Sequence, residues 1–274
     1  MTQIPPPFPP ALPPPPPPPS APALPPPRLG VIDAMSLGWQ LVKSDFWLLW
    51  IIALVAMVMQ ALSGPGAIVV APVTMAGLFY VLMRRMDGHK VEFVELFEGF
   101  RQRFVPSFVA GLIPVAAQIL PILIWLPMHL TIVFGSMAVI GHRPGPEAPL
   151  VIMPLFCLEW VVLCVLILVS LVVYMFFIFA QCAVWDLPQS GWEAAKRSAR
   201  MVRSHLASVV GLMVLFWLAG MGFAFVGYCT LCIGFIFLMP LWHIWYAATV
   251  LYLYRSWKQE ELAAPATPPA VQAG

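Results

Sequence analysis

Few side chains in this sequence could carry chemistry, and His243 is the foremost of them. It lies in an apolar stretch beside Trp242 and Trp245, shortly after Pro240. An ionisable side chain inside a membrane span suggests a functional site by default, because burying it in lipid costs free energy. A neutral histidine that is hydrogen-bonded to a neighbouring helix is an equally good interpretation.

Three glutamines lie in other apolar stretches: Gln60, Gln118 and Gln181. An amide inside a membrane can bind a ligand, or it can hydrogen-bond to a neighbouring helix and hold a bundle together. We take His243, Gln181 and Gln60 as the candidate ligand-binding residues.

Other reactive groups are sparse. Cys229 and Cys232 have a Cys-x-x-Cys spacing, which could be redox-active or form a disulfide. No second pair completes a metal site, so apolar packing is the other interpretation. The sequence contains no H-E-x-x-H, G-x-S-x-G or Walker motif. We therefore expect no catalytic residue, metal or cofactor, and we favour a protein that is not an enzyme.

Positive charge gathers in one short segment, which holds Lys196, Arg197, Arg200 and Arg203. In a helix over residues 192–205 these four side chains fall within an arc of roughly 120°. Ser190 is the expected N-cap, with Glu193 three residues later, and Glu193 can pair with Arg197. We interpret the arc as a face that binds anionic phospholipid headgroups and orients the next span. A basic pocket for an anionic substrate is the alternative.

The whole composition predicts a membrane protein. Of the 274 residues, 61% are hydrophobic and 9% are charged, against about 25% charged in soluble domains. The fold class is therefore all-α, a polytopic membrane helical bundle of about six transmembrane helices with cytoplasmic amphipathic helices. The net charge of +2 does not suggest a nucleic-acid partner. The six predicted spans are Phe46–Leu62, Gly66–Met83, residues 104–126, a span that ends before Asp186, Leu206–Tyr228 and Leu231–Tyr254.

The two middle spans lie in apolar stretches that are longer than a membrane requires, which is about 20 helical residues. Pro114, Pro121 and Pro127 can break the first stretch. We expect residues 128–140 and 149–160 to lie outside the true spans, either in the interface or as a helical extension. Glu159 would then lie near the outer boundary.

The distribution of basic residues predicts the orientation. With six spans, thirteen of the 14 Lys and Arg residues fall on one side and only Arg143 falls on the other. Cytoplasmic loops carry the excess of basic residues. We therefore predict a multi-pass protein of the cell inner membrane with both termini in the cytoplasm.

The chain divides into three parts. Residues 1–30 form a proline-rich tail, predicted to be disordered, which acts either as a spacer or as a docking site for a protein partner. Residues 31–257 form the membrane domain. Residues 258–274 are predicted to be a disordered C-terminal tail.

The membrane domain contains a predicted parallel repeat over residues 33–83 and 193–254. The stretch "DAMSLGWQLVKSD" aligns with "EAAKRSARMVRSH", and "GAIVVAP" shares its Gly-x5-Pro spacing with "GFIFLMP". Each unit would be an amphipathic helix followed by a membrane hairpin. A further amphipathic helix is predicted over Val91–Phe104, lying on the membrane or capping the bundle.

The stretches "GLFYVLMRRMDGHKVEFVELFEGF" and "WEAAKRSARMVRSH" resemble those of uncharacterised six-helix bacterial membrane proteins. That group is similar to the membrane domain fused to some glycerophosphodiester phosphodiesterases. The resemblance implies a bacterial inner-membrane protein, and it supplies no catalytic residue because the phosphodiesterase domain is not present.

Three functions fit these patterns. A non-enzymatic scaffold or accessory role agrees with the sparse chemistry and the proline-rich tail. A small-molecule or lipid transporter or channel subunit agrees with the repeat and with the Gly/Pro-interrupted spans. An intramembrane enzyme that acts on lipid has the least support.

Overall fold

The computed structural model describes residues 29–142, 148–186, 188–230 and 233–263. These ranges are helical and contain no strand, which confirms an all-α polytopic bundle. The predicted proline-rich tail lies outside them, apart from residues 29–30. The elements are α1 (Val31–Ser44), α2 (Phe46–Leu62), η1 (Gly64–Gly66), α3 (Ala67–Met86), η2 (Phe93–Phe97), α4 (Glu98–Arg101), α5 (Phe104–His142), α6 (Ala148–Phe177), α7 (Ala180–Asp186), α8 (Gly191–Ser204), α9 (Leu206–Cys229) and α10 (Ile233–Ala263).

Five described helices are long and apolar enough to cross a membrane, and the number rises to six if α1 and α2 count as one bent span. The two helices meet at 100°. The bend lies at Asp45, whose φ of −138° and ψ of 51° end α1 before α2 begins. The predicted span Phe46–Leu62 is therefore a helix of 17 residues that leaves an amphipathic helix at a sharp angle.

The two units predicted as a repeat have the same order of elements: α1, α2 and α3 in one, α8, α9 and α10 in the other. Both begin with a helix of 14 residues. Both then turn through a single non-helical residue, since His205 has φ −126° and ψ 30°, close to the values at Asp45. The last helix of each unit contains an internal proline, Pro72 or Pro240.

The prediction of one amphipathic helix over Val91–Phe104 is wrong. The segment forms η2 and α4, and Phe104 already begins α5. The cause is close packing against α3, because a Cβ at Gly77 would lie 1.8 Å from the Leu96 carbonyl oxygen. Leu96 is fully buried there. The segment therefore caps the end of the bundle.

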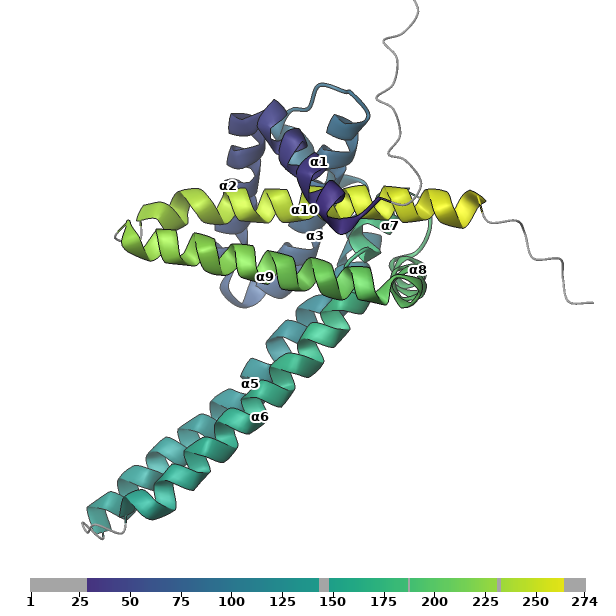
Figure 1. Cartoon of the computed structure of the whole chain (residues 1–274). Coiled ribbons are helices and arrows are strands. Elements are labelled where there is room, and N and C mark those ends of the chain that lie inside the picture. Colours follow the sequence, from purple (N-terminus) through teal and green to yellow (C-terminus); the bar gives the residue numbers. More distant parts are fainter. Residues whose placement is uncertain (1–28, 143–147, 187, 231–232, 264–274) are drawn as a thin grey trace, which may run out of the picture.

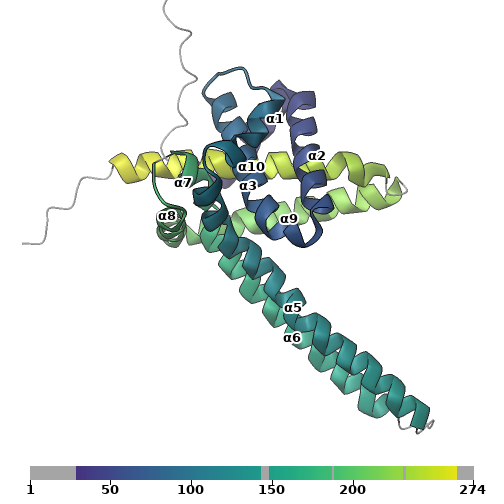
Figure 2. The same ribbon diagram turned by 180° about the vertical axis from the view of Figure 1, so that it is seen from behind.

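α5 and α6 form a long antiparallel hairpin that projects away from the other helices (Figures 1 and 2). At 1.5 Å per residue the 39 residues of α5 span about 58 Å, against a hydrocarbon core of about 30 Å. Residues 128–140 thus continue the helix, which is the helical-extension alternative. The three prolines do not break it, contrary to the expectation for this stretch.

One of these prolines has a visible compensation. Pro121 has no N–H to donate to the carbonyl of Ala117, one turn earlier. The hydroxyl of Ser170 on α6 donates a hydrogen bond to this carbonyl instead. Prolines are tolerated in membrane helices when a neighbouring side chain satisfies the freed backbone group in this way.

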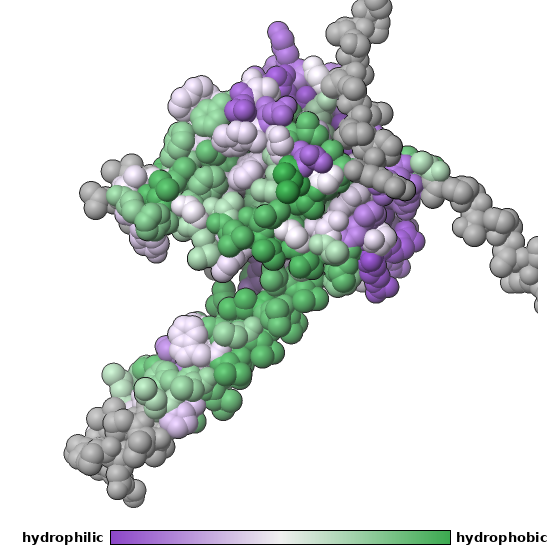
Figure 3. Space-filling model, in the orientation of Figure 1, coloured by the Kyte–Doolittle hydropathy of each residue, from purple (hydrophilic) through white to green (hydrophobic). Residues whose placement is uncertain are grey.

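The charged residues gather at one end of the molecule, around α8 and the segment between α3 and α5 (Figure 3). Ion pairs join segments that the charge distribution assigned to one side of the membrane: Arg85 with Asp45, Arg255 with Asp87, Lys258 with Asp186 and Arg197 with Glu261. Two of them involve the last turns of α10, which continues through residues 258–263. These residues were expected to belong to the C-terminal tail and are helical instead.

Candidate functional site

A cavity lies between α9 and the packed helices α3, α5, α6 and α10. Its larger part has a volume of about 580 Å³ and a smaller, deeper part has about 160 Å³. The two parts share the lining residues Met75, Gln118, Tyr174, His243 and Tyr246, so we treat them as one site. The packing explains the space: α2 packs against both α3 and α10, whereas its counterpart α9 packs chiefly against α10.

The structure brings the three predicted ligand-binding residues to this site. Gln60 of α2, Gln181 of α7 and His243 of α10 all line the deeper part of the cavity. Gln118 of α5 lines both parts. These residues are far apart in the sequence, and helix packing alone makes them neighbours. Their role in binding stays a prediction.

Each predicted residue has a defined contact. Nε2 of His243 lies 3.0 Å from the sulfur of Met75 on α3. Gln60 donates a hydrogen bond to the hydroxyl of Thr74 at 3.0 Å. Both contacts join neighbouring helices, so the interpretation of these side chains as interhelical links is compatible with their position at the cavity.

Gln181 is the most constrained of the three. Its Nε2 donates to the carbonyl oxygen of Ser107 at 3.0 Å, while its Oε1 is buried without a hydrogen-bond partner. Gly111 allows this arrangement, since a Cβ there would lie 2.3 Å from the Gln181 amide nitrogen and 2.5 Å from Pro72. A buried acceptor without a partner costs free energy and needs an explanation.

Two tyrosines complete the polar part of the cavity. The hydroxyls of Tyr174 on α6 and Tyr246 on α10 lie 3.2 Å apart. The ring of Tyr246 stacks on Trp242 at 5.9 Å and meets Phe216 edge-on at 5.0 Å. Sequence reasoning missed both tyrosines. Their position inside apolar spans was the only available signal, because a buried tyrosine hydroxyl needs a hydrogen-bond partner.

The mouth of the cavity opens between α6 and α9. Leu171, Val214 and Trp217 line the larger part and are also 43%, 50% and 64% exposed on the outside. The surface over α9 and the base of the hairpin is mostly hydrophobic (Figure 3). An opening in such a surface admits molecules from the hydrocarbon region of a bilayer more readily than from water.

The basic segment forms α8 as predicted, with the predicted cap. The Ser190 side chain accepts a hydrogen bond from the N–H of Glu193, and the Glu193 carboxylate accepts one from the N–H of Ser190. Glu193 is thus not the partner of Arg197, which pairs instead with Glu261 at 2.8 Å. The prediction of a Glu193–Arg197 pair is wrong, because the Glu193 carboxylate is engaged in the capping box and α10 supplies Glu261 to Arg197.

The four basic side chains of α8 therefore divide into two groups. Arg197 is only 12% exposed and holds the end of α10. Lys196, Arg200 and Arg203 are exposed, and the ammonium of Lys196 lies over the ring of Trp192 at 5.5 Å. Only these three remain free to bind headgroups. Neither of the two described parts of the cavity is lined by a basic residue of α8, so they give no support to the alternative of a basic pocket.

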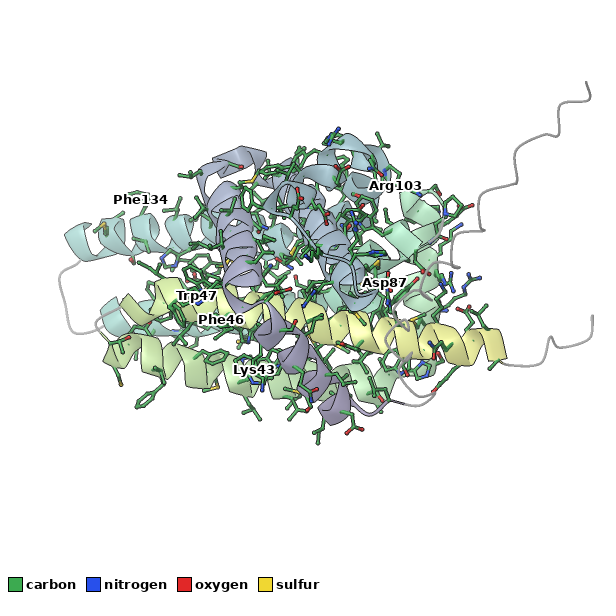
Figure 4. The ribbon with its side chains drawn as sticks, turned by 90° about the horizontal axis from the view of Figure 1, so that it is seen from above. Lys43, Phe46, Trp47, Asp87, Arg103 and Phe134 are labelled. Atoms are coloured by element: carbon green, nitrogen blue, oxygen red, sulfur yellow. The ribbon has the colours of Figure 1, made fainter. Side chains whose placement is uncertain are left out.

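A second polar pair lies on the projecting hairpin. Nδ1 of His129 lies 2.6 Å from Oε1 of Glu159, whose side chain is 2% exposed. The imidazole stacks on Trp125 at 4.7 Å and meets Phe156 edge-on. The pair fixes the register of α5 against α6 on the part of the hairpin that lies away from the body, where Figure 4 also places Phe134. Sequence reasoning named Glu159 and missed His129.

The described residues contain no group of three His, Cys, Asp or Glu side chains that could hold a metal ion. Cys229 is a free thiol at the end of α9, and Cys232 lies outside the described residues. Comparisons with protein-family models, with curated proteins and with solved structures find no match for this chain.

Proposed function

We propose that this membrane protein binds a small amphipathic molecule, which enters the cavity sideways from the bilayer, and that it acts as a transporter or carrier subunit. The observation that carries the proposal is the convergence of Gln60, Gln181 and His243 on one cavity with an apolar mouth. Its volume of about 580 Å³ is within the range of small-molecule sites, about 300–1,000 Å³. Such sites are mostly apolar with a few polar groups.

The two similar units support a transport role. Substrate sites of many transporters lie between repeats, at helices interrupted by glycine or proline. Here Pro72 and Pro240 occupy equivalent positions, and the cavity lies beside both helices. The difference in packing between α2 and α9 is what opens the cavity on one side only.

The proposed location is the bacterial inner membrane, with both termini in the cytoplasm. The charged end of the molecule supports this placement, since it contains the basic segments that the positive-inside rule assigns to the cytoplasm. Lys196, Arg200 and Arg203 are the side chains proposed to bind anionic headgroups. The proline-rich tail, which precedes α1 at this end, is proposed to act as a spacer or to bind a cytoplasmic protein.

A scaffold role is the second candidate, and the α5–α6 hairpin favours it. Beyond the body, this hairpin exposes large apolar side chains that include Phe134, Met137 and Trp160. A surface of this kind contacts either lipid or another protein. A scaffold would need the hairpin and would not need the cavity, so the two roles predict different sensitive residues.

The test uses the full-length protein purified in mild detergent and examined by native mass spectrometry for co-purified lipid-like molecules. Val214→Trp fills the mouth of the cavity and should remove most of the bound molecule. Val210→Trp is the matched control, because Val210 lies one turn earlier on α9 at 44% exposure and does not line the cavity. Equal retention by both variants would contradict a role of this cavity in binding.

A further inference from the structure

We infer that the molecule bound in this cavity is an uncharged amphiphile whose head carries a hydroxyl group, with the head at Gln181 and Gln118 and the apolar chain at the mouth. This inference rests on the proposed binding function and names the chemical class that the site selects. Three features of the site support it: the charge of the lining, the hydrogen-bonding groups at the deep end and the shape of the open end.

The lining carries no Asp, Glu, Lys or Arg among the described residues. Its ionisable groups are His243, which contacts the Met75 sulfur, and two tyrosines, which contact each other. A phosphate or carboxylate would therefore enter an apolar site without an opposite charge. Burying an ion without a partner is far more costly than burying a hydroxyl that can hydrogen-bond. The site discriminates against phospholipids and fatty acids on this ground.

The deep end needs a hydrogen-bond donor. Oε1 of Gln181 is buried and accepts no hydrogen bond, because the Gln181 amide nitrogen is directed to the Ser107 carbonyl. Because Gln181 lines the cavity, a turn of its side chain toward the cavity lets a ligand hydroxyl donate to this oxygen, whereas a ketone or ester oxygen cannot. Gln118 is exposed, lines both parts of the cavity and has no hydrogen bond with another described residue. Its amide can donate to the oxygen of the same hydroxyl.

The open end fits a hydrocarbon chain. The larger part of the cavity is lined there by Leu171, Met213, Val214, Phe216 and Trp217. These side chains offer contact area and, apart from the indole N–H, no polar group. Because Leu171, Val214 and Trp217 are also exposed to the outside, a chain that leaves the mouth enters the surrounding apolar phase. The amphiphile thus lies with its head inside the bundle and its tail toward lipid.

The experiment compares probes that share their acyl chains and differ in the head. The full-length protein in nanodiscs is titrated with dioleoylglycerol, with its hydroxyl-acetylated derivative, with dioleoylphosphatidylglycerol and with oleic acid. Each probe is used in a form whose oleoyl chains are dibrominated, so that its binding quenches tryptophan fluorescence. The part of the quenching that is lost in Val214→Trp but kept in Val210→Trp is taken as cavity binding. We expect dioleoylglycerol to bind at least ten times more tightly than either charged probe, and at least three times more tightly than the acetylated derivative.

A variant tests the head position. Gln118→Met keeps the side-chain size, removes the amide and breaks no hydrogen bond within the described protein. It should weaken the binding of dioleoylglycerol at least threefold and weaken the binding of the acetylated derivative less. Gln40→Met, on the exposed face of α1, is the control.

The outcomes are distinguishable. Cavity binding that favours a charged probe would overturn this inference while leaving the proposed binding function in place. Equal affinity for the free and the acetylated hydroxyl would overturn the assignment of the head. If no probe shows binding that is sensitive to Val214→Trp, the proposed function itself fails, and this inference fails with it.

Discussion

The sulfur of Met75 lies 3.0 Å from Nε2 of His243, and each of the two residues stands three positions after the proline of its helix. The contact therefore joins equivalent positions of the two similar units. Arg255 and Asp87 repeat the relationship, because their ion pair spans the same sequence separation of 168 residues. Two such contacts, twelve residues apart along each helix, mean that α3 and α10 run side by side in the same direction and in register.

This register predicts a cross-linking pattern. With the native cysteines replaced and a protease site inserted at residues 187–190, a short bifunctional thiol reagent should join the two fragments in the pair Met75→Cys with His243→Cys. The pair Asp87→Cys with Arg255→Cys should behave alike. The mismatched pair Met75→Cys with Arg255→Cys should not react, because these positions lie a full twelve residues out of register. A reactive mismatched pair with unreactive matched pairs would refute the parallel arrangement.

The sequence was informative where local patterns decide the structure. Hydropathy located the helices of both units, and the capping box at Ser190 and Glu193 was readable because its partners are three residues apart. The division of the 91–104 segment was not readable, because the contact of Gly77 with Leu96 decides it. Arg197 was assigned to the wrong partner for the same reason, since Glu261 is 64 residues away.

The site shows the same limit. Gln60, Gln181 and His243 could each be selected as a polar residue in an apolar stretch, whereas their convergence depends on how α2, α7 and α10 pack. His129 was missed because Glu159, its partner, is 30 residues away on the other arm of the hairpin. Hydropathy identifies the polar residues whose burial costs free energy. Only the packing of the helices shows which of these residues contact one another.

The hydrogen bond from Ser170 to the Ala117 carbonyl predicts a coupled pair of substitutions. Ser170→Ala should lower the stability by about 0.6 kcal/mol, the average measured for hydrogen bonds between membrane helices, and by no more than about 1.7 kcal/mol, the largest value measured. In a Pro121→Ala background the alanine supplies the missing N–H, so the same substitution should cost much less. Unfolding measurements on the four proteins of this double-mutant cycle give the coupling energy. Identical costs in both backgrounds would show that the serine does not compensate the proline.

The buried pair of His129 and Glu159 predicts an asymmetric response. His129→Leu leaves the buried Glu159 carboxyl group without its hydrogen-bond partner and should lower the stability by about 1–3 kcal/mol, the cost of an unsatisfied buried polar group. The double variant His129→Leu with Glu159→Leu should recover most of this loss, because no buried polar group is left without a partner. Thermal unfolding in detergent measures both effects. A double variant as unstable as the single one would mean that the pair holds the hairpin together by itself.

The close approach at Gly77 predicts a local disruption. Gly77→Ala places a methyl group 1.8 Å from the Leu96 carbonyl and should displace η2 from α3. Limited proteolysis within residues 84–103 should then become faster. Gly211→Ala is the control, because a Cβ at Gly211 meets no atom within 4 Å. In that helix interior alanine is favoured over glycine by roughly 0.5–1 kcal/mol, so the control should be neutral or slightly more stable. Unchanged proteolysis of Gly77→Ala would show that the segment can move without detaching.

The basic residues of α8 should differ in their roles: three of them orient the protein, and one holds the C-terminal end of α10. Replacing Lys196, Arg200 and Arg203 with Gln removes three exposed charges, each worth about 1 kcal/mol near an anionic leaflet, or about 3 kcal/mol in sum. Misinsertion of α9 should therefore rise, as measured by accessibility from outside intact cells of cysteines placed in the exposed positions of residues 188–205, which directly precede α9. Arg197→Gln should leave insertion unchanged and instead speed proteolysis after residue 257, because the pair with Glu261 is lost. If Arg197→Gln alone disturbed insertion while the triple variant inserted normally, the three exposed charges would have no part in setting the orientation. Their role would then be to bind a ligand at that face of α8.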